Sequence, residues 1–133
     1  MPSLPRIKRT RPRGPNAVAQ RARPEPAELA AAGLTWIHLD APDGEAAQLL
    51  ASRFGWHPLD VEDVLSKRQR PKVDDYADEG YLFSVLHFPV WDPAIQRLNA
   101  GELDVFLGPD YLVTLPTVEL RPVTLLFRRA YES

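Results

Sequence analysis

The sequence predicts a mixed α/β fold, in which helices cover both faces of a largely antiparallel sheet (an α/β/α sandwich). Residues 81–90 are apolar at nearly every position, which is typical of a strand covered on both sides. Residues 102–107 and 111–115 are predicted as two further strands, because residues 108–110 between them (Gly-Pro-Asp) have the composition of a hairpin turn. Segments with helical spacing of apolar residues flank these strands, so we expect an antiparallel meander with helices packed on it.

The chain divides into a basic tail and an acidic domain. Its 133 residues suit a single domain. Residues 1–26 hold six of the 14 prolines, and residues 1–24 carry seven basic side chains and no acidic one, which leaves a net charge of −9 on the rest. We expect residues 1–26 to be a disordered or loosely docked tail and residues 27–133 to be the folded domain. The tail could contact nucleic acid or anionic lipid, but no aromatic residues alternate with its arginines, which favours a solvated extension.

The start of the domain is predicted from its glycine and its β-branched residues. We expect residues 28–32 to form a short helix that ends at Gly33. Residues 35–39 are β-branched and aromatic, which predicts a strand.

Two helices are predicted next. The first begins with Pro42 in its opening turn or with Asp43 as its cap, and it ends at Gly55. Its expected apolar face consists of Ala46, Leu49, Leu50 and Phe54. The second begins at Pro58, directly after His57. Its expected buried stripe consists of Val61, Val64 and Leu65, with Glu62 and Asp63 off that stripe.

The remaining segments complete the predicted layers. Pro71 disfavours helical geometry at Arg70, and Lys72–Tyr76 is expected to be a short strand before a turn at residues 78–80. Residues 93–101 are predicted to be a connection. The last element is a helix over Arg121–Glu132, with Pro122 at its start. Its expected apolar face consists of Val123, Leu126, Phe127 and Ala130.

Several functional classes are excluded or left without support. The chain has no cysteine and therefore no disulfide framework and no thiolate zinc site. Its three histidines, His38, His57 and His87, lack a partner at metal-ligand spacing, which favours hydrogen-bonded or capping roles. No catalytic motif is present, so we predict that the chain is not an enzyme. The longest stretch without Asp, Glu, Lys or Arg, residues 80–91, includes His87 and is too short to cross a bilayer.

The most informative region is 54–76. It contains His57-Pro58-Leu59, then Glu62-Asp63, then Gln69-Arg70-Pro71-Lys72 and Tyr76. In this order the motifs resemble the cytosolic N-terminal domain of the CorA family of magnesium transporters, and the resemblance extends over residues 35–130. Trp56, Arg68 and Pro116 depart from the family pattern, which leaves the subfamily and its metal open.

The resemblance implies the fold and the role of a regulatory, magnesium-sensing domain. Family members are pentameric membrane channels for magnesium, and for cobalt in some cases. In them this domain lies on the cytoplasmic side of the membrane. Magnesium bound between protomers favours the closed pentamer. The stalk and membrane helices of the family are absent from this sequence, so we expect an excised domain that is a monomer or weak dimer. Contact with a membrane is then expected only through those absent helices, and no nucleic-acid partner is expected. The alternative is a soluble binding module whose basic tail contacts nucleic acid or anionic membrane.

Asp92 is the candidate metal ligand. By the resemblance it matches the sensor aspartate and is half of a site shared between protomers, so the isolated domain is expected to bind magnesium weakly. Judged from the residues alone, magnesium often uses only one or two carboxylates and keeps its waters. Spacing alone favours a solvated turn acid, or a cap before Pro93, over a metal ligand at this position.

A scaffold role is predicted for the charged residues of the motif region. Glu62 and Asp63 offer carboxylates near Arg70 and Lys72, which Pro71 holds in extended geometry. We therefore expect a bidentate pair between Arg70 and one of these carboxylates to fix the connection between helix and strand.

Overall fold

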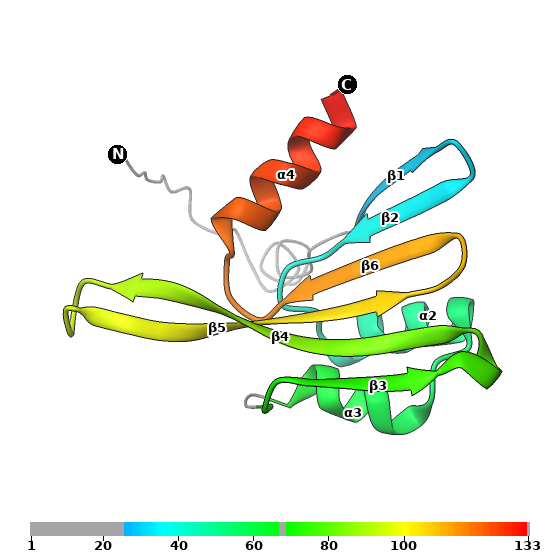
Figure 1. The fold of residues 1–133 in the computed structure, drawn as a ribbon, viewed down its shortest axis with the longest axis horizontal. Helices are drawn as coiled ribbons and strands as arrows, with labels where there is room; N and C mark the ends of the chain where they lie inside the picture. The colour runs from blue at the N-terminus through cyan, green and yellow to red at the C-terminus, as the bar shows by residue number, and fades with distance from the viewer. Residues whose placement is uncertain (1–25, 67–68, 133) are drawn as a thin grey trace, which may run out of the picture.

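The computed structural model describes residues 26–66 and 69–132 (Figure 1). The predicted tail therefore lies, except for Pro26, outside the described residues, and so does Arg68. The sheet has six strands: β1 (Ala27–Ala31), β2 (Leu34–His38), β3 (Lys72–Tyr76), β4 (Tyr81–Asp92), β5 (Arg97–Leu107) and β6 (Tyr111–Pro116). Within the described residues, the helices are α2 (Gly44–Phe54), α3 (Pro58–Leu65) and α4 (Arg121–Glu132), with a 3₁₀ turn, η1 (Ala77–Glu79).

The sheet is mixed and largely antiparallel, as predicted. Its strand order is β1-β2-β6-β5-β4-β3. Among the strands of the described residues, only β2 and β6 pair in parallel, and β4, β5 and β6 form the predicted meander in the middle of the sheet. The paired strands place Lys72, Val85, Asp104 and Leu115 in one row across four strands. Because directly paired residues point to the same face, this row lies on one side of the sheet.

Helices lie on both faces of the sheet. Figure 1 shows α2 and α3 together on one side and α4 on the other. Ile37 of β2 belongs to the core that includes the buried side chains of α2 and α3. Its neighbours point the other way: the ring of Trp36 meets Phe127 of α4 edge-on at 4.9 Å, and the ring of His38 stacks on Phe127 at 5.6 Å. Successive side chains of β2 thus pack alternately against α4 on one face of the sheet and against the core with α2 and α3 on the other.

The core is rich in stacked aromatic rings. Trp56, which follows α2, stacks on Phe106 of β5 with 3.5 Å between ring centroids, and its indole N–H donates to the hydroxyl of Tyr111 at 3.1 Å. Phe106 in turn stacks on Phe83 of β4 at 4.6 Å. Phe83 and Phe106 are fully buried. Rings packed this way contribute beyond the area that they bury.

The predicted helix over residues 28–32 is wrong, because this segment is the edge strand β1. Ala32 and Gly33 have φ of 56° and 80° and form a two-residue turn that pairs Ala31 with Leu34. Positive φ at both central residues characterises the turns whose twist suits a hairpin. Pairing with β2 here overrides the helical preference of the alanines.

The predicted connection over residues 93–101 is correct only for residues 93–96, which form the turn between β4 and β5. Strand β5 begins at Arg97, which pairs with Asp92, so β4 and β5 form one long hairpin (Figure 1). Asn99, Ala100 and Gly101 are poor strand formers, which explains the error. Gly101 is needed in the strand, because a Cβ atom there would lie 2.7 Å from Val90 and 2.8 Å from Leu120.

The predicted faces of the helices and of β4 are only partly correct. α2 buries Leu50 as expected, but together with Ala47 and Ala51, while Leu49 is 64% exposed. Leu65 of α3 and Leu126 of α4 are also exposed. The coverage predicted for both sides of 81–90 holds only for the first half of β4, since every position from Leu86 to Asp92 is exposed or half-buried. The spacing of apolar residues marks a face of each helix, but only part of that face is buried against the sheet.

The helix starts follow the predicted capping logic. Asp43 accepts a hydrogen bond from the backbone N–H of Ala46 at 2.8 Å, and the imidazole Nδ1 of His57 accepts from that of Leu59 at 3.1 Å. Both contacts satisfy amide groups that the first turn leaves unpaired. Within residues 26–66 and 69–132, no helix is long and apolar enough to cross a membrane.

Candidate functional site

The motif residues gather where α3 meets β3 and β4. His57 caps α3, and Pro58 occupies its first position. The backbone N–H of His57 donates to the hydroxyl of Tyr81 at 2.8 Å, and its ring stacks on Tyr76 at 5.9 Å. The histidine-proline motif thus fixes the start of α3 against two tyrosines.

These two tyrosines bind a buried carboxylate. Asp60, 1% exposed, accepts from the hydroxyl of Tyr81 at 2.6 Å and from that of Tyr76 at 3.0 Å. Burial raises the pKa of Asp60, and the two hydroxyl donors oppose that rise. Burial and the Asp60 carboxylate raise the pKa of Tyr76 to about 12, so this hydroxyl stays protonated and remains a donor.

The ion pair that joins α3 to β3 is made by Lys72. Its ammonium lies 2.7 Å from Asp63 and 3.0 Å from Asp74. Hydrogen bonds to both carboxylates raise the pKa of Lys72 above its ordinary value. The predicted pair with Arg70 is wrong: Arg70 is exposed, and no ion pair joins it to Asp63 or to the exposed Glu62 among the described residues. Pro71 separates the two basic residues, so that Lys72 already belongs to β3 while Arg70 precedes it.

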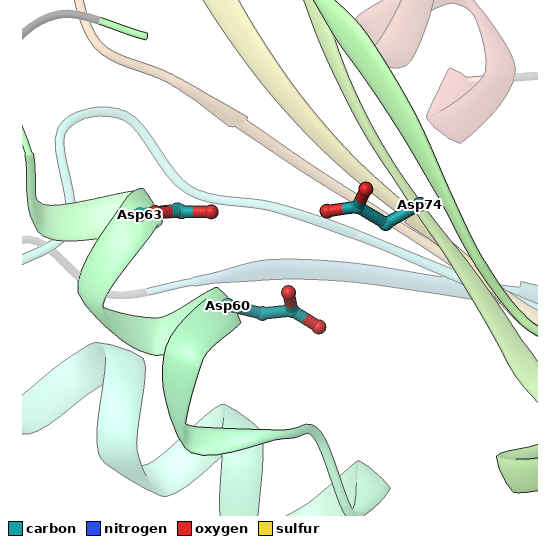
Figure 2. A group of neighbouring side chains, drawn as sticks. All are labelled: Asp60, Asp63 and Asp74. Carbon is teal, nitrogen blue, oxygen red and sulfur yellow. The ribbon is translucent and has the colours of Figure 1, made fainter.

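Asp60, Asp63 and Asp74 form an acidic cluster that could hold a metal ion. Figure 2 shows Asp60 and Asp63 projecting from α3 toward Asp74 on β3. One oxygen from each lies within 4.8 Å of the others. The ammonium of Lys72, however, already binds two of the three, and both oxygens of Asp60 accept tyrosine hydroxyls. A metal ion would have to displace these donors, so we assign the cluster to the scaffold.

The connection between α3 and β3 is tied to the sheet at Gln69. Its backbone N–H donates to Glu102 at 3.1 Å, and its carbonyl oxygen lies 2.8 Å from Nε2 of His87. A carbonyl only accepts, so Nε2 carries the hydrogen. All three histidines therefore have structural partners, as predicted, since Nδ1 of His38 lies 2.7 Å from the hydroxyl of Thr114.

Asp92 lies apart from this scaffold, at the end of β4 in the long hairpin. One carboxylate oxygen accepts from the backbone N–H of Ala94 at 3.0 Å and the other from the side chain of Asn99 at 3.1 Å. The turn-acid role left open by the sequence is thus present. Asp92 also lines a hollow of about 800 Å³, together with Glu102, Glu119 and Asn99. Each of its oxygens keeps a second lone pair available to a cation.

Sequence reasoning missed Asp60, Glu102 and Asp104. Asp60 precedes the buried Val64 by four positions, which places it on the buried face of α3. Glu102 and Asp104 alternate with Leu103 and share their face of β5 with the core residue Phe106. The sequence alone shows both the helical spacing of Asp60 and the strand alternation of Glu102 and Asp104. These positions were not predicted to be buried because acidic side chains are usually exposed.

Comparison with known proteins gives one family. The model described as CorA-like Mg²⁺ transporter protein matches residues 31–133. Bacillus subtilis YfjQ, assigned by its name to metal-ion transport, is 33% identical over 100 residues, which are 74% of this chain and 29% of that protein. The cobalt/magnesium transport protein CorA of Thermotoga maritima is 34% identical over 74 residues, which are 55% and 20%. This chain therefore spans less than a third of the length of either relative.

Solved structures show the same fold. The soluble domain of CorA from Methanocaldococcus jannaschii superimposes with a TM-score of 0.63 at 18% identity, over 76% of this chain and 38% of that one. The ZntB cytoplasmic domain from Vibrio parahaemolyticus gives 0.59 at 10% identity, over 71% and 38%. The six-stranded sheet and the three helices of the described residues match the fold of these domains.

Proposed function

This chain belongs to the CorA-like Mg²⁺ transporter protein family, and on that premise we propose that it is the cytosolic, magnesium-sensing domain of a divalent-cation channel. Its role is regulatory and not enzymatic. In the complete protein it sits on the cytoplasmic side of the membrane, within a pentamer. Magnesium, or cobalt, is the cargo of the channel and magnesium is also the ligand that regulates it.

The position of Asp92 supports this proposal. Its carboxylate is oriented by Ala94 and Asn99 at the rim of a hollow, on a hairpin that extends beyond the rest of the sheet (Figure 1). A protruding segment can reach a neighbouring subunit. Mg²⁺ keeps several waters and binds through one or two carboxylates. Asp92 supplies one of them, and the second comes from a neighbouring protomer.

Sensing follows from where the ion binds. An ion held between two protomers stabilises only the arrangement that brings both carboxylates together. A high magnesium concentration therefore favours the closed pentamer, and a fall in the concentration favours the open one. Allosteric couplings are typically about 1–3 kcal/mol, or roughly 5- to 150-fold in affinity. The isolated chain has half of each site, so we expect it to be a monomer or weak dimer that binds magnesium weakly.

The test is inhibition of transport by magnesium in the complete parent protein, reconstituted in vesicles. Asp92→Ala is expected to raise the magnesium concentration needed for half-inhibition by about 5- to 150-fold. Asp78→Ala, at an exposed acid of η1, is the matched control and is expected to leave inhibition unchanged. Unaltered inhibition in Asp92→Ala would remove this residue from the sensor.

A second measurement tests whether the site is shared. Calorimetry of the isolated chain with magnesium chloride is expected to give weak heats without a defined stoichiometry. A tight, stoichiometric site that is lost in Asp92→Ala would show that one chain completes the site alone.

A further inference from the structure

Two carboxyl groups are buried side by side on β5 without enough donors. Glu102 and Asp104 are 5% and 0% exposed. One oxygen of Glu102 accepts from the backbone N–H of Gln69, but the other, and both oxygens of Asp104, have no hydrogen-bond partner among the described residues. Leaving such groups unpaired is costly, so three converging acceptors without a donor need an explanation.

Among the described residues, no cation forms an ion pair with Glu102 or Asp104. The exposed Arg70 lines the same hollow as Glu102 without such a contact. From β4 and β6, Asp104 is flanked by the apolar Val85 and Leu115. The charges whose fields reach it are Asp63 from α3 and Lys72 from β3, besides Glu102 itself. The ammonium of Lys72 is already bound by Asp63 and Asp74.

His87 of β4 pairs with Glu102 in the sheet, but it does not supply the missing donor. Its Nε2 hydrogen is directed to the carbonyl of Gln69 at 2.8 Å. Two ionised carboxylates here would therefore repel each other in an apolar setting without compensation.

We propose that Glu102 and Asp104 form a buried proton-binding site in which one proton is shared between the two carboxyl groups. Asp104 carries the proton and donates it in a hydrogen bond to the unpaired oxygen of Glu102. The pair then holds one proton and one negative charge, and the remaining Glu102 oxygen keeps its bond to Gln69. Burial, with the adjacent Glu102, raises the pKa of Asp104 to about 9, in agreement with this arrangement.

The proton is linked to the connection between α3 and β3. Glu102 binds Gln69 and also lines the hollow that contains Asp92. When the proton leaves, a second negative charge appears beside Glu102, and the geometry that holds Gln69 is no longer favoured. The protonation of this pair thus makes the Gln69 side of the hollow sensitive to pH.

The experiment is a carbon-13 NMR titration of the full 133-residue chain, observing the carboxyl carbons. We expect the Asp104 carboxyl carbon to keep the chemical shift of a neutral acid through pH 7, and its midpoint to lie about 5 pH units above that of an ordinary aspartate. The Glu102 carbon and the Gln69 amide are expected to move in the same step. An ionised Asp104 at pH 7 would overturn the proposal.

Two variants separate the shared proton from a merely buried acid. Asp104→Asn keeps the shape and offers an N–H donor to Glu102, so the high-pH step at the Gln69 amide is expected to disappear. Glu102→Gln removes the neighbouring charge, and the midpoint of Asp104 is expected to fall by at least one pH unit. An unchanged midpoint in Glu102→Gln would contradict the sharing, even if the first variant failed to fold. Asp110→Asn, in the exposed turn after β5, is the control for both and should leave the titration unaltered.

A metal ion is the competing occupant. Manganese chloride at pH 7 is expected to leave the Asp104 resonance sharp. Selective broadening of Asp104 and Glu102 would show that the pair binds a cation in place of the proton, and would overturn the proposal.

Discussion

Lys72 on β3 and Asp63 on α3 form the ion pair that ties the helix to the sheet, with 2.7 Å between Nζ and the carboxylate oxygen. The same ammonium lies over the ring of Phe83, 5.6 Å from its centroid. Its contacts with two carboxylates and an aromatic face distinguish Lys72 from Arg70, which is exposed two positions earlier. A short step along an extended chain thus decides which basic residue carries the contact.

The first prediction compares these two basic residues. Lys72→Met keeps most of the aliphatic stem and removes the charge, so it is expected to lower the free energy of unfolding by about 1 kcal/mol, a value limited by the partial exposure of the pair. Arg70→Ala is expected to leave the midpoint of urea unfolding unchanged. An equal loss of stability in both variants would show that Arg70 contributes as much to the scaffold as Lys72.

The second prediction concerns the hydroxyl that Tyr81 donates to Asp60 at 2.6 Å. Tyr81→Phe leaves a buried carboxylate with one donor fewer and is expected to cost about 1–3 kcal/mol of stability, measured by urea unfolding. The matched control is Tyr131→Phe, because Tyr131 is 59% exposed. In an Asp60→Asn background the cost of Tyr81→Phe should be smaller. A cost that is the same in both backgrounds would show that the two side chains are not coupled.

The third prediction is a dependence of stability on pH. Because its pKa is raised to about 9, folded Asp104 binds a proton that the unfolded chain has already lost above about pH 4. The folded state therefore holds more protons than the unfolded state between these values, and the free energy of unfolding falls as pH rises through this window.

Asp104→Asn removes this contribution. Relative to the unsubstituted chain, the variant should gain stability from pH 5 to pH 8.5, by at most roughly 1.4 kcal/mol per pH unit. Urea unfolding at pH 5, 7 and 8.5 measures the difference. Parallel stability curves for the two proteins would mean that Asp104 does not hold its proton in the folded state.

The fourth prediction tests the packing at the base of the long hairpin. Gly101→Ala is expected to cost about 1–3 kcal/mol, because the added methyl group would press on Val90 and Leu120. Gly44→Ala, in the first turn of α2, is the control, since the nearest atom to its new Cβ would be 4.0 Å away. It is expected to be neutral or stabilising by less than about 1 kcal/mol. A thermal melt measures both, and a Gly101→Ala protein as stable as the original would show that the hairpin adjusts freely.

Sequence patterns predicted the middle of the sheet and the two capped helices because local signals coincide there. Asp43, Pro58 and the 108–110 turn each carry a strong positional preference. Strand β1 was missed because its alanines favour a helix locally, and only pairing with β2 decides otherwise. The prediction for residues 97–101 failed for a similar reason. Pairing with β4 holds these residues in a strand although several of them have a low preference for strands.

The candidate site was predictable only in part. The motif located Asp63 and Lys72, but its spacing does not say which basic residue pairs with which acidic residue. That pairing depends on where β3 begins after Pro71. Asp104 was hidden by a general expectation that acidic residues are exposed. Asp104 lies two positions before Phe106 and therefore on the same face of the strand, which predicts that it is buried. In the structure both side chains are buried.

The parallel pairing of β2 with β6 constrains how the chain folds. The side chains of His38 and Thr114 meet across 76 positions of sequence, whereas each of the other described strand pairs joins two strands that are consecutive in the chain. The entropy of closing so long a loop must be offset before this contact is rewarded, which slows folding. The β1–β2 hairpin therefore cannot join the rest of the sheet during synthesis until β6 has been made, so the last of the described strands is the one that completes the sheet.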